Sequence, residues 1–111
     1  MKIAILLPFK DTYTKNKAGS ASIWVKDFIK KSKYKNKILI YGYIKKLNKK
    51  TLIDTKNYIN INYNFDYYIG GKNKKYVEIF NKLVQRSNVD LVELHNRPNY
   101  INYLDQNLKK I

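Results

Sequence analysis

The chain has 111 residues, enough for one small domain with its own apolar core. It contains no cysteine and one histidine, which excludes disulfide bonds, thiolate metal sites and histidine-rich metal sites. Its formal net charge of +15 is typical of proteins that bind nucleic acid, an anionic membrane or an anionic substrate. The lysines are spread along a chain rich in Asn, Ile and Tyr, residues with A- and T-rich codons, so gene composition also accounts for the charge.

The first expected element is a strand over residues 2–7. Its apolar run from Ile3 to Leu7 is continuous and stops at Pro8, as in a strand that is buried on both faces. This N-terminus lacks the small-residue cleavage site of a secretory signal, so we expect a cytoplasmic protein. A polar loop then leads to Gly19.

The second element is an amphipathic helix with a basic face. Ser20 or Ser22 can cap its N-terminus, and Trp24 shares one stripe with Phe28. The opposite stripe carries three lysines, Lys26, Lys30 and Lys33. These lysines form either a solvated face or a surface that rests on anionic lipid headgroups at the inner face of the membrane.

The rest of the chain alternates between strand and helix patterns. In chain order we expect a strand at 38–44, a connection of undefined form at 45–57, an edge or half-exposed strand at 58–64, a helix at 74–86, a strand at 89–95 and a helix at 98–110. This order predicts one α/β domain over residues 1–111, with a Rossmann-like parallel sheet and flanking helices. Ligands of such sheets bind beyond the carboxyl ends of the strands.

Two segments should reach that edge. In the loop from Pro8 to Gly19, the glycine permits close approach of a phosphate or sugar oxygen to the first amides of the helix, or serves only the turn. After the strand at 89–95, His95 and Asn96 offer hydrogen bonds and Arg97 a cationic fork, or they serve only the strand end and turn. Glu93 should share the side of His95 and either orient its ring or remain a solvated or packed carboxylate. The sequence shows no catalytic set and no metal site.

Four stretches resemble the N-terminal half of a family 4 glycosyltransferase with the GT-B architecture: "MKIAILLPF", "AGSAS", "ILIYGY" and "NVDLVELHNRPNYINYL". The resemblance covers nearly the whole chain, and "VELHNRP" is its most specific part. It implies a transferase, usually retaining, that moves a sugar from a nucleotide-sugar donor to a lipid or saccharide acceptor in lipopolysaccharide, capsule or similar glycan synthesis. By the same resemblance, Gly19 belongs to the loop that faces the donor phosphate and the transferred sugar, and His95 and Asn96 line the cleft. Ser20 and Arg97 complete the set of residues that we expect to bind substrate.

The chain departs from this family in two ways. Ala18 stands where the loop often has the first glycine of a pair, and the donor-binding C-terminal domain is absent. We therefore expect an incomplete acceptor-side domain that is inactive alone or completed by a separate polypeptide, with no cofactor besides the nucleotide-sugar co-substrate. The rival predictions are a basic nucleic-acid-binding module with stacking tyrosines, another Rossmann-like domain and a non-catalytic remnant. The missing three-glycine motif and acidic cluster argue against nicotinamide-dependent and response-regulator domains, and no nucleic-acid motif is recognisable.

Overall fold

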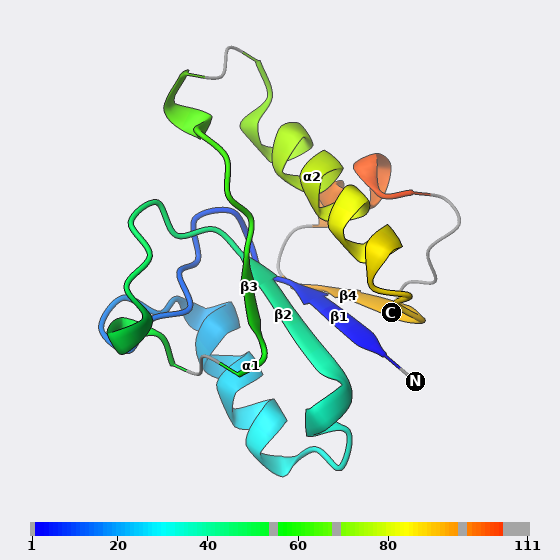
Figure 1. Cartoon of the computed structure of the whole chain (residues 1–111). Coiled ribbons are helices and arrows are strands. Elements are labelled where there is room, and N and C mark those ends of the chain that lie inside the picture. The colour runs from blue at the N-terminus through cyan, green and yellow to red at the C-terminus, as the bar shows by residue number, and fades with distance from the viewer. Residues whose placement is uncertain (1, 54–55, 68–69, 96–97, 106–111) are drawn as a thin grey trace.

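The structure is a computed structural model that describes residues 2–53, 56–67, 70–95 and 98–105. It confirms an α/β fold, compatible with a Rossmann-like domain, in which helices flank a four-stranded parallel sheet (Figure 1). The helices and strands are β1 (Ile3–Leu6), α1 (Ser20–Lys31), β2 (Ile38–Gly42), β3 (Tyr58–Asn60), α2 (Lys72–Arg86) and β4 (Leu91–Leu94).

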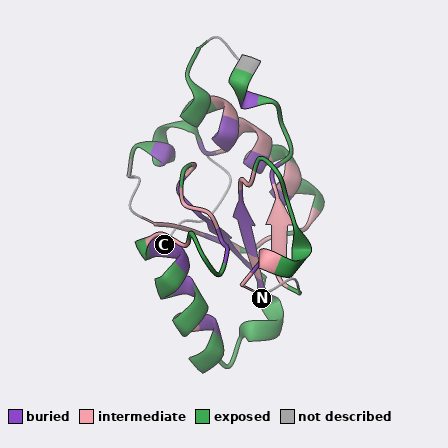
Figure 2. Ribbon diagram, turned by 90° about the vertical axis from the view of Figure 1, so that its left-hand side faces the viewer, coloured by how far each residue is buried: buried purple, intermediate pink, exposed green. Residues whose placement is uncertain are grey.

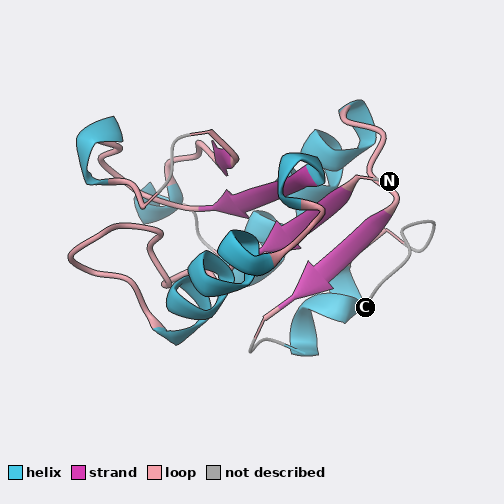
Figure 3. Cartoon of the chain, turned by 90° about the horizontal axis from the view of Figure 1, so that it is seen from below, coloured by secondary structure: helices cyan, strands magenta, loops and turns pink. Residues whose placement is uncertain are grey.

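The strand order is β3-β2-β1-β4, and each neighbouring pair is parallel (Figure 3). All four residues of β1 are buried, as predicted for a strand covered on both faces. The chain moves from β1 through β2 to β3 on one side, and α2 then brings it back to place β4 on the other side of β1. The strand order therefore reverses between β1 and β4.

Alternate residues of β1 supply two separate cores. Ile3 and Ile5 pack with Val25 on the α1 face, whereas Ala4 and Leu6 belong to the larger, aromatic-rich cluster on the α2 face. Figure 2 shows the buried strand between helices whose outer surfaces are exposed. Alternate side chains of the strand thus pack against the apolar face of one helix or the other, and this packing holds the three layers together.

Helix α1 buries Ala21, Ser22, Val25 and Ile29, and leaves Trp24 48% exposed. Its N-cap residue is Gly19, so neither of the two predicted serine caps is the cap. The helix ends at Lys31, and Ser32 is extended. The predicted lysine stripe is therefore wrong at Lys33, which lies beyond the helix with its ammonium 5.2 Å from the centre of the Tyr34 ring.

The predicted C-terminal helix is the clearest error. Pro98–Tyr103 is a short 3-10 helix, residues 104–105 lie outside it, and residues 106–110 lie outside the described part of the chain. The physical reason is the side chain of Asn81 in α2. Its amide nitrogen donates to the carbonyl of Tyr103 at 2.9 Å, and its oxygen accepts from the backbone of Asp105 at 3.2 Å. Backbone groups that a continuing α-helix would use are thus bonded to a side chain.

The strand predicted at 58–64 is also shorter than expected. Beyond Asn60, the amide of Ile61 still donates to the carbonyl of Gly42, the last residue of β2. The side chain of Asn60 then bonds both the amide and the carbonyl of Ile44, at 2.8 and 3.2 Å. Because the backbone of Ile44 bonds to this side chain, it forms no ladder hydrogen bonds with the residues after Ile61, and β3 ends.

The connection from β2 to β3 contains little regular structure. Its described residues form one short 3-10 helix, Lys49–Thr51, whose start is capped by the side chain of Asn48. Leu52 then makes an antiparallel bridge with Thr14 of the loop after β1. No α-helix covers this part of the α1 face among the described residues, and a groove lies open there.

Candidate functional site

The reversal of strand order places the candidate site at the carboxyl ends of β1 and β4. In open parallel sheets the loops diverge at such a point and leave a crevice for a ligand. The loop from Leu7 to Gly19 follows β1, and His95 follows β4 directly. The loop after β1 and His95 therefore reach the same edge of the sheet.

The N-terminus of α1 is occupied by a carboxylate of the chain itself. Asp11 accepts hydrogen bonds from the backbone of Gly19 at 2.9 Å and of Ala21 at 3.0 Å. It also accepts from Ser22, through the backbone at 3.3 Å and the hydroxyl at 2.6 Å. A negative group at this end also interacts favourably with the helix dipole. Asp11 thus takes the amides that were expected to meet a donor phosphate.

The close approach of Asp11 explains the glycine at position 19. A Cβ on Gly19 would lie 2.8 Å from three carboxyl atoms of Asp11, so the carboxylate would have to move away to admit a side chain. The backbone angles of Gly19 are those of ordinary extended chain, so the requirement is steric. A phosphate that approached the same amides would also meet like charge on Asp11. Substrate binding by Gly19 and Ser20, the exposed first residue of α1, stays a prediction.

The start of the same loop is fixed by two tyrosines from the α2 face. The hydroxyl of Tyr76 donates to the carbonyl of Leu7 at 2.7 Å, and the hydroxyl of Tyr100 accepts from the amide of Phe9 at 3.0 Å. Tyr100 in turn donates to Asn73 at 2.9 Å. Burial raises the pKa of Tyr76 well above its ordinary value of 10.0, so its hydroxyl remains a donor over a wide pH range. The loop is therefore held from both faces of the sheet.

His95 is less well satisfied than Asp11. Its ring lies 4.9 Å from the ring of Trp24, and its Nε2 lies 3.2 Å from a carboxylate oxygen of Glu93. The expected proximity of Glu93 is confirmed, but the angles do not fit a hydrogen bond. The buried Nε2 has no hydrogen-bond partner among the described residues. Trp24 belongs to the second turn of α1, so the contact links the two parts of the site.

Other predicted site residues fall outside this picture. Asn96 and Arg97 lie outside the described residues. Lys26 and Lys30 lie on the exposed surface of α1, away from its buried face. Within the described ranges, no group of three or more acidic or histidine side chains is placed to hold a metal ion.

Sequence reasoning missed the roles of Asp11 and Trp24. The sequence pattern assigns no role to Asp11, although a carboxylate eight residues before a helix-starting glycine is the available signal. Trp24 was assigned to a helix stripe, and no local pattern indicates that it reaches the end of β4. Both contacts join segments that are distant in sequence, which periodicity alone does not pair.

Comparisons with protein-family models, with curated proteins and with solved structures gave no match to this chain. The functional argument therefore depends on the residues and their geometry. Of the helices in the described part of the chain, none combines the length and the apolar character needed to cross a membrane.

Proposed function

We propose that this chain is the acceptor-side, N-terminal domain of a retaining glycosyltransferase of family 4. The complete enzyme would transfer a sugar from a nucleotide-sugar donor to a lipid or saccharide acceptor in lipopolysaccharide or related glycan synthesis. The domain would be an incomplete half of a GT-B enzyme, located in the cytoplasm and peripherally on the inner face of the membrane. A second domain or a separate polypeptide would bind the donor.

The observation that carries this proposal is the buried Nε2 of His95 at the switch point of the sheet. A buried polar atom without a hydrogen bond costs free energy, about 1–3 kcal/mol for an isolated group. The carboxylate of Glu93, 3.2 Å away, lowers this cost for Nε2, and a rotation of the ring toward the surface would let Nε2 bond to a ligand hydroxyl group. The neighbouring Trp24 ring is half exposed and offers an apolar face beside the same position. A saccharide combines hydroxyl groups with apolar ring faces, so this pair suits a sugar.

The contact of Asp11 with the helix amides supports an acceptor role over a donor role for this half. The donor of such enzymes carries a diphosphate, which is anionic, whereas Asp11 already supplies an anion at the N-terminus of α1. Neutral hydroxyl groups of an acceptor meet no such repulsion. The diphosphate would be neutralised by the other domain, and without that electrostatic stabilisation the chain alone should not turn over.

The proposal is tested by nuclear magnetic resonance on the 15N-labelled chain. We expect lipopolysaccharide core oligosaccharide to shift the signals of the His95 ring and of the Trp24 indole, and UDP-glucose to leave both unchanged. His95→Phe should abolish the saccharide shifts while Trp24 remains as a reporter. Identical shifts in the variant, or no shift at millimolar saccharide, would contradict the proposal.

Activity gives a second check on the same proposal. We expect the isolated chain to transfer no radiolabelled sugar from UDP-glucose or GDP-mannose to the core oligosaccharide above the enzyme-free rate. Measurable transfer by the chain alone would show that the donor-binding function is already present, against the proposed division of roles.

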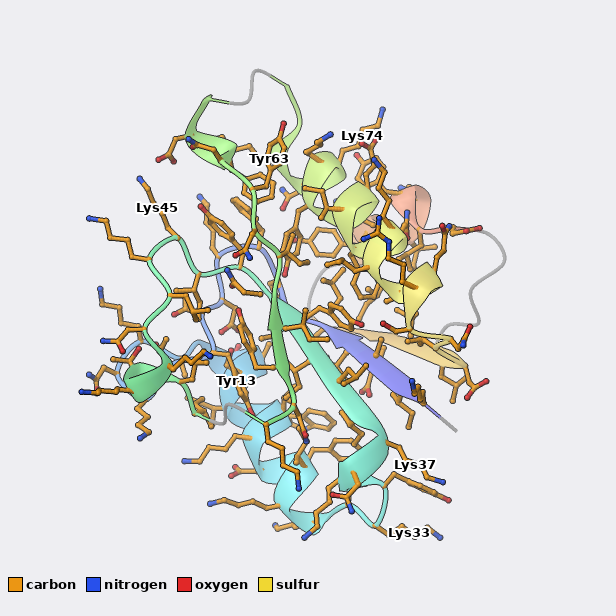
Figure 4. The ribbon with its side chains drawn as sticks, viewed as in Figure 1. Tyr13, Lys33, Lys37, Lys45, Tyr63 and Lys74 are labelled. Carbon is orange, nitrogen blue, oxygen red and sulfur yellow. The ribbon has the colours of Figure 1, made fainter. Side chains whose placement is uncertain are left out.

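A second candidate function, binding of single-stranded nucleic acid, is favoured by one surface. Tyr63 is 40% exposed, and the ammonium of Lys75 lies 5.2 Å from the centre of its ring. Lys45 and Lys74 lie at the same end of the molecule (Figure 4). Stacking and phosphate contacts there would give an affinity for oligo(dT) that falls steeply with salt. Salt-independent or absent binding in a filter assay would exclude this candidate.

A further inference from the structure

A groove runs along α1 on the side where no α-helix connects β2 to β3. Its volume is about 670 Å³, within the range of small-molecule sites. One wall is a side of α1, and the other is formed by residues 13–16 together with Ala18 and Ile53. We call this feature the α1 groove.

The wall opposite α1 is well fixed. The amide of Lys15 donates to the carbonyl of Thr51 at 2.8 Å, and the amide of Ile53 donates to the carbonyl of Tyr13 at 3.3 Å. The hydroxyl of Thr14 accepts from the amide of Lys17 at 3.2 Å. The Tyr13 ring stacks on Tyr58 with ring centres 5.6 Å apart. The groove is therefore formed by bonded segments that join two loops.

The lining has one apolar part and one cationic part. The apolar part consists of Tyr13, Ala18, Ile23, Ile29 and Ile53. The cationic part consists of three exposed lysines, Lys15, Lys26 and Lys30. None of the described lining residues is acidic, and the neighbouring Asp27 of α1 is exposed without lining the groove. This composition suits a ligand with an anionic group joined to an apolar one.

The outer surface of α1 adds a second apolar feature. Ile23 is 52% exposed and Trp24 is 48% exposed, next to each other in the first half of the helix. Tryptophan beside lysines is typical of surfaces that lie at the boundary of headgroups and acyl chains. A free phosphate would use the lysines but leave these apolar groups in water. The combination favours a lipid in a membrane.

We propose that the α1 groove binds the headgroup of an anionic phospholipid, with its phosphate among Lys15, Lys26 and Lys30 and its first methylene groups against Ile23 and Ile53. This inference deepens the membrane part of the proposed function and is independent of sugar transfer. The lysines that contact lipid in this proposal are Lys15, Lys26 and Lys30, and Lys33 of the predicted stripe is not among them. Figure 4 shows Lys33 and Lys37 apart from Tyr13, at the bottom of the view, and neither lines the groove.

The test is co-sedimentation of the full chain with vesicles of phosphatidylcholine, with and without phosphatidylglycerol. We expect binding only in the presence of phosphatidylglycerol. Lys15→Gln, Lys26→Gln and Lys30→Gln together should weaken it on the order of 100-fold, since each lysine near an anionic surface contributes about five-fold. The matched control, Lys31→Gln, Lys33→Gln and Lys35→Gln together, removes the same charge and should weaken binding less than about five-fold.

Variants that leave the charge unchanged distinguish binding in the groove from nonspecific electrostatic attraction to the membrane. Ala18→Leu should fill part of the groove and reduce vesicle binding at least ten-fold, while the unfolding temperature reports that the fold is retained. Ile23→Ser, at an exposed position, should reduce binding without affecting the fold. Short-chain probes provide a further test on the 15N-labelled chain. Dihexanoyl phosphatidylglycerol should shift the amide signals of Ile23 and Ile53, which line the groove, and inorganic phosphate or dihexanoyl phosphatidylcholine should not.

The outcomes distinguish the inference from the proposed function. Equal weakening by both triple variants would overturn the groove and retain a diffuse basic membrane surface. No binding to any vesicle would overturn both the groove and the membrane part of the proposed function. Neither result bears on the saccharide shifts at His95, which test sugar binding separately.

Discussion

The N-terminus of α1 and the end of β4 lie at the same edge of the sheet but differ in how their polar groups are satisfied. At α1, Asp11 accepts four hydrogen bonds from Gly19, Ala21 and Ser22. At β4, the buried Nε2 of His95 has no hydrogen-bond partner among the described residues. A helix N-terminus is a common anion-binding site, but here the carboxylate of Asp11 already occupies it. The end of β4 is a less obvious site, yet it holds the buried nitrogen that lacks a hydrogen bond. The two candidates thus differ in whether the chain itself satisfies their polar groups, and the proposed function places the ligand at His95 for that reason.

The largest effect should follow from removing the carboxylate of Asp11. Asp11→Ala leaves the amides at the start of α1 without their charged acceptor, and we expect a loss of about 2–3 kcal/mol in the free energy of unfolding. Urea denaturation followed by circular dichroism measures the loss. Asp27→Ala removes an exposed carboxylate from the same helix and should change stability by less than about 0.5 kcal/mol. Equal effects of the two substitutions would contradict the assigned role of Asp11.

A smaller loss should follow from adding a methyl group at position 19. Gly19→Ala places a Cβ 2.8 Å from the Asp11 carboxylate and should cost about 1–2 kcal/mol, because the carboxylate must move off its donors. Gly71 is the matched control, since it is the N-cap residue of α2 and its nearest contact would be at 3.5 Å. Gly71→Ala should stay within about 0.5 kcal/mol of the parent in the same assay. A tolerated Gly19→Ala would mean that Asp11 is not held as described.

The tie from Tyr76 to the start of the loop should contribute about 1 kcal/mol. Tyr76→Phe removes the donor to Leu7, whereas Tyr34→Phe changes a side chain that is 41% exposed and should have little effect.

The raised pKa of Tyr76 predicts a dependence of stability on pH. Above pH 10.0 the unfolded chain loses this proton first, so stability falls as the pH rises. Urea titrations from neutral to alkaline pH should show that the free energy of unfolding falls less steeply with pH in Tyr76→Phe than in the parent chain. The same steepness in both proteins would contradict a raised pKa of Tyr76.

The smallest effect is expected at His95. His95→Phe keeps a ring against Trp24 and removes both ring nitrogens, including the buried Nε2 that has no hydrogen-bond partner among the described residues, so stability should not fall by more than about 0.5 kcal/mol. His95→Ala also removes the ring contact and should cost about 1 kcal/mol. A large loss in the phenylalanine variant would reveal that the imidazole is needed for folding, and the contrast with Asp11 would disappear.

The sequence was sufficient to predict elements that depend on local pattern. The buried strand at Ile3–Leu6 and helix α2 follow from continuous or periodic apolar residues, and their alternation predicted the parallel sheet. The site was predicted only as an edge where two loops meet. The acceptance of helix amides by Asp11 and the contact of Trp24 with His95 depend on chain segments brought together by the fold. The hydrogen bonds of Asn81 also depend on the fold, because this residue of α2 bonds backbone groups of the segment where the C-terminal helix was predicted.

The free edge of β4 has a consequence for how the protein behaves in concentrated solution. Among the described residues, β4 pairs with β1 on one side and with no strand on the other, so one row of its backbone donors and acceptors faces outward. Such an edge is a template for strand addition, by a complementing polypeptide or by aggregation with other copies. The net charge of +15 opposes the second process through mutual repulsion, which salt weakens. Colloidal stability should therefore decline with rising ionic strength even while the fold of each molecule is unchanged.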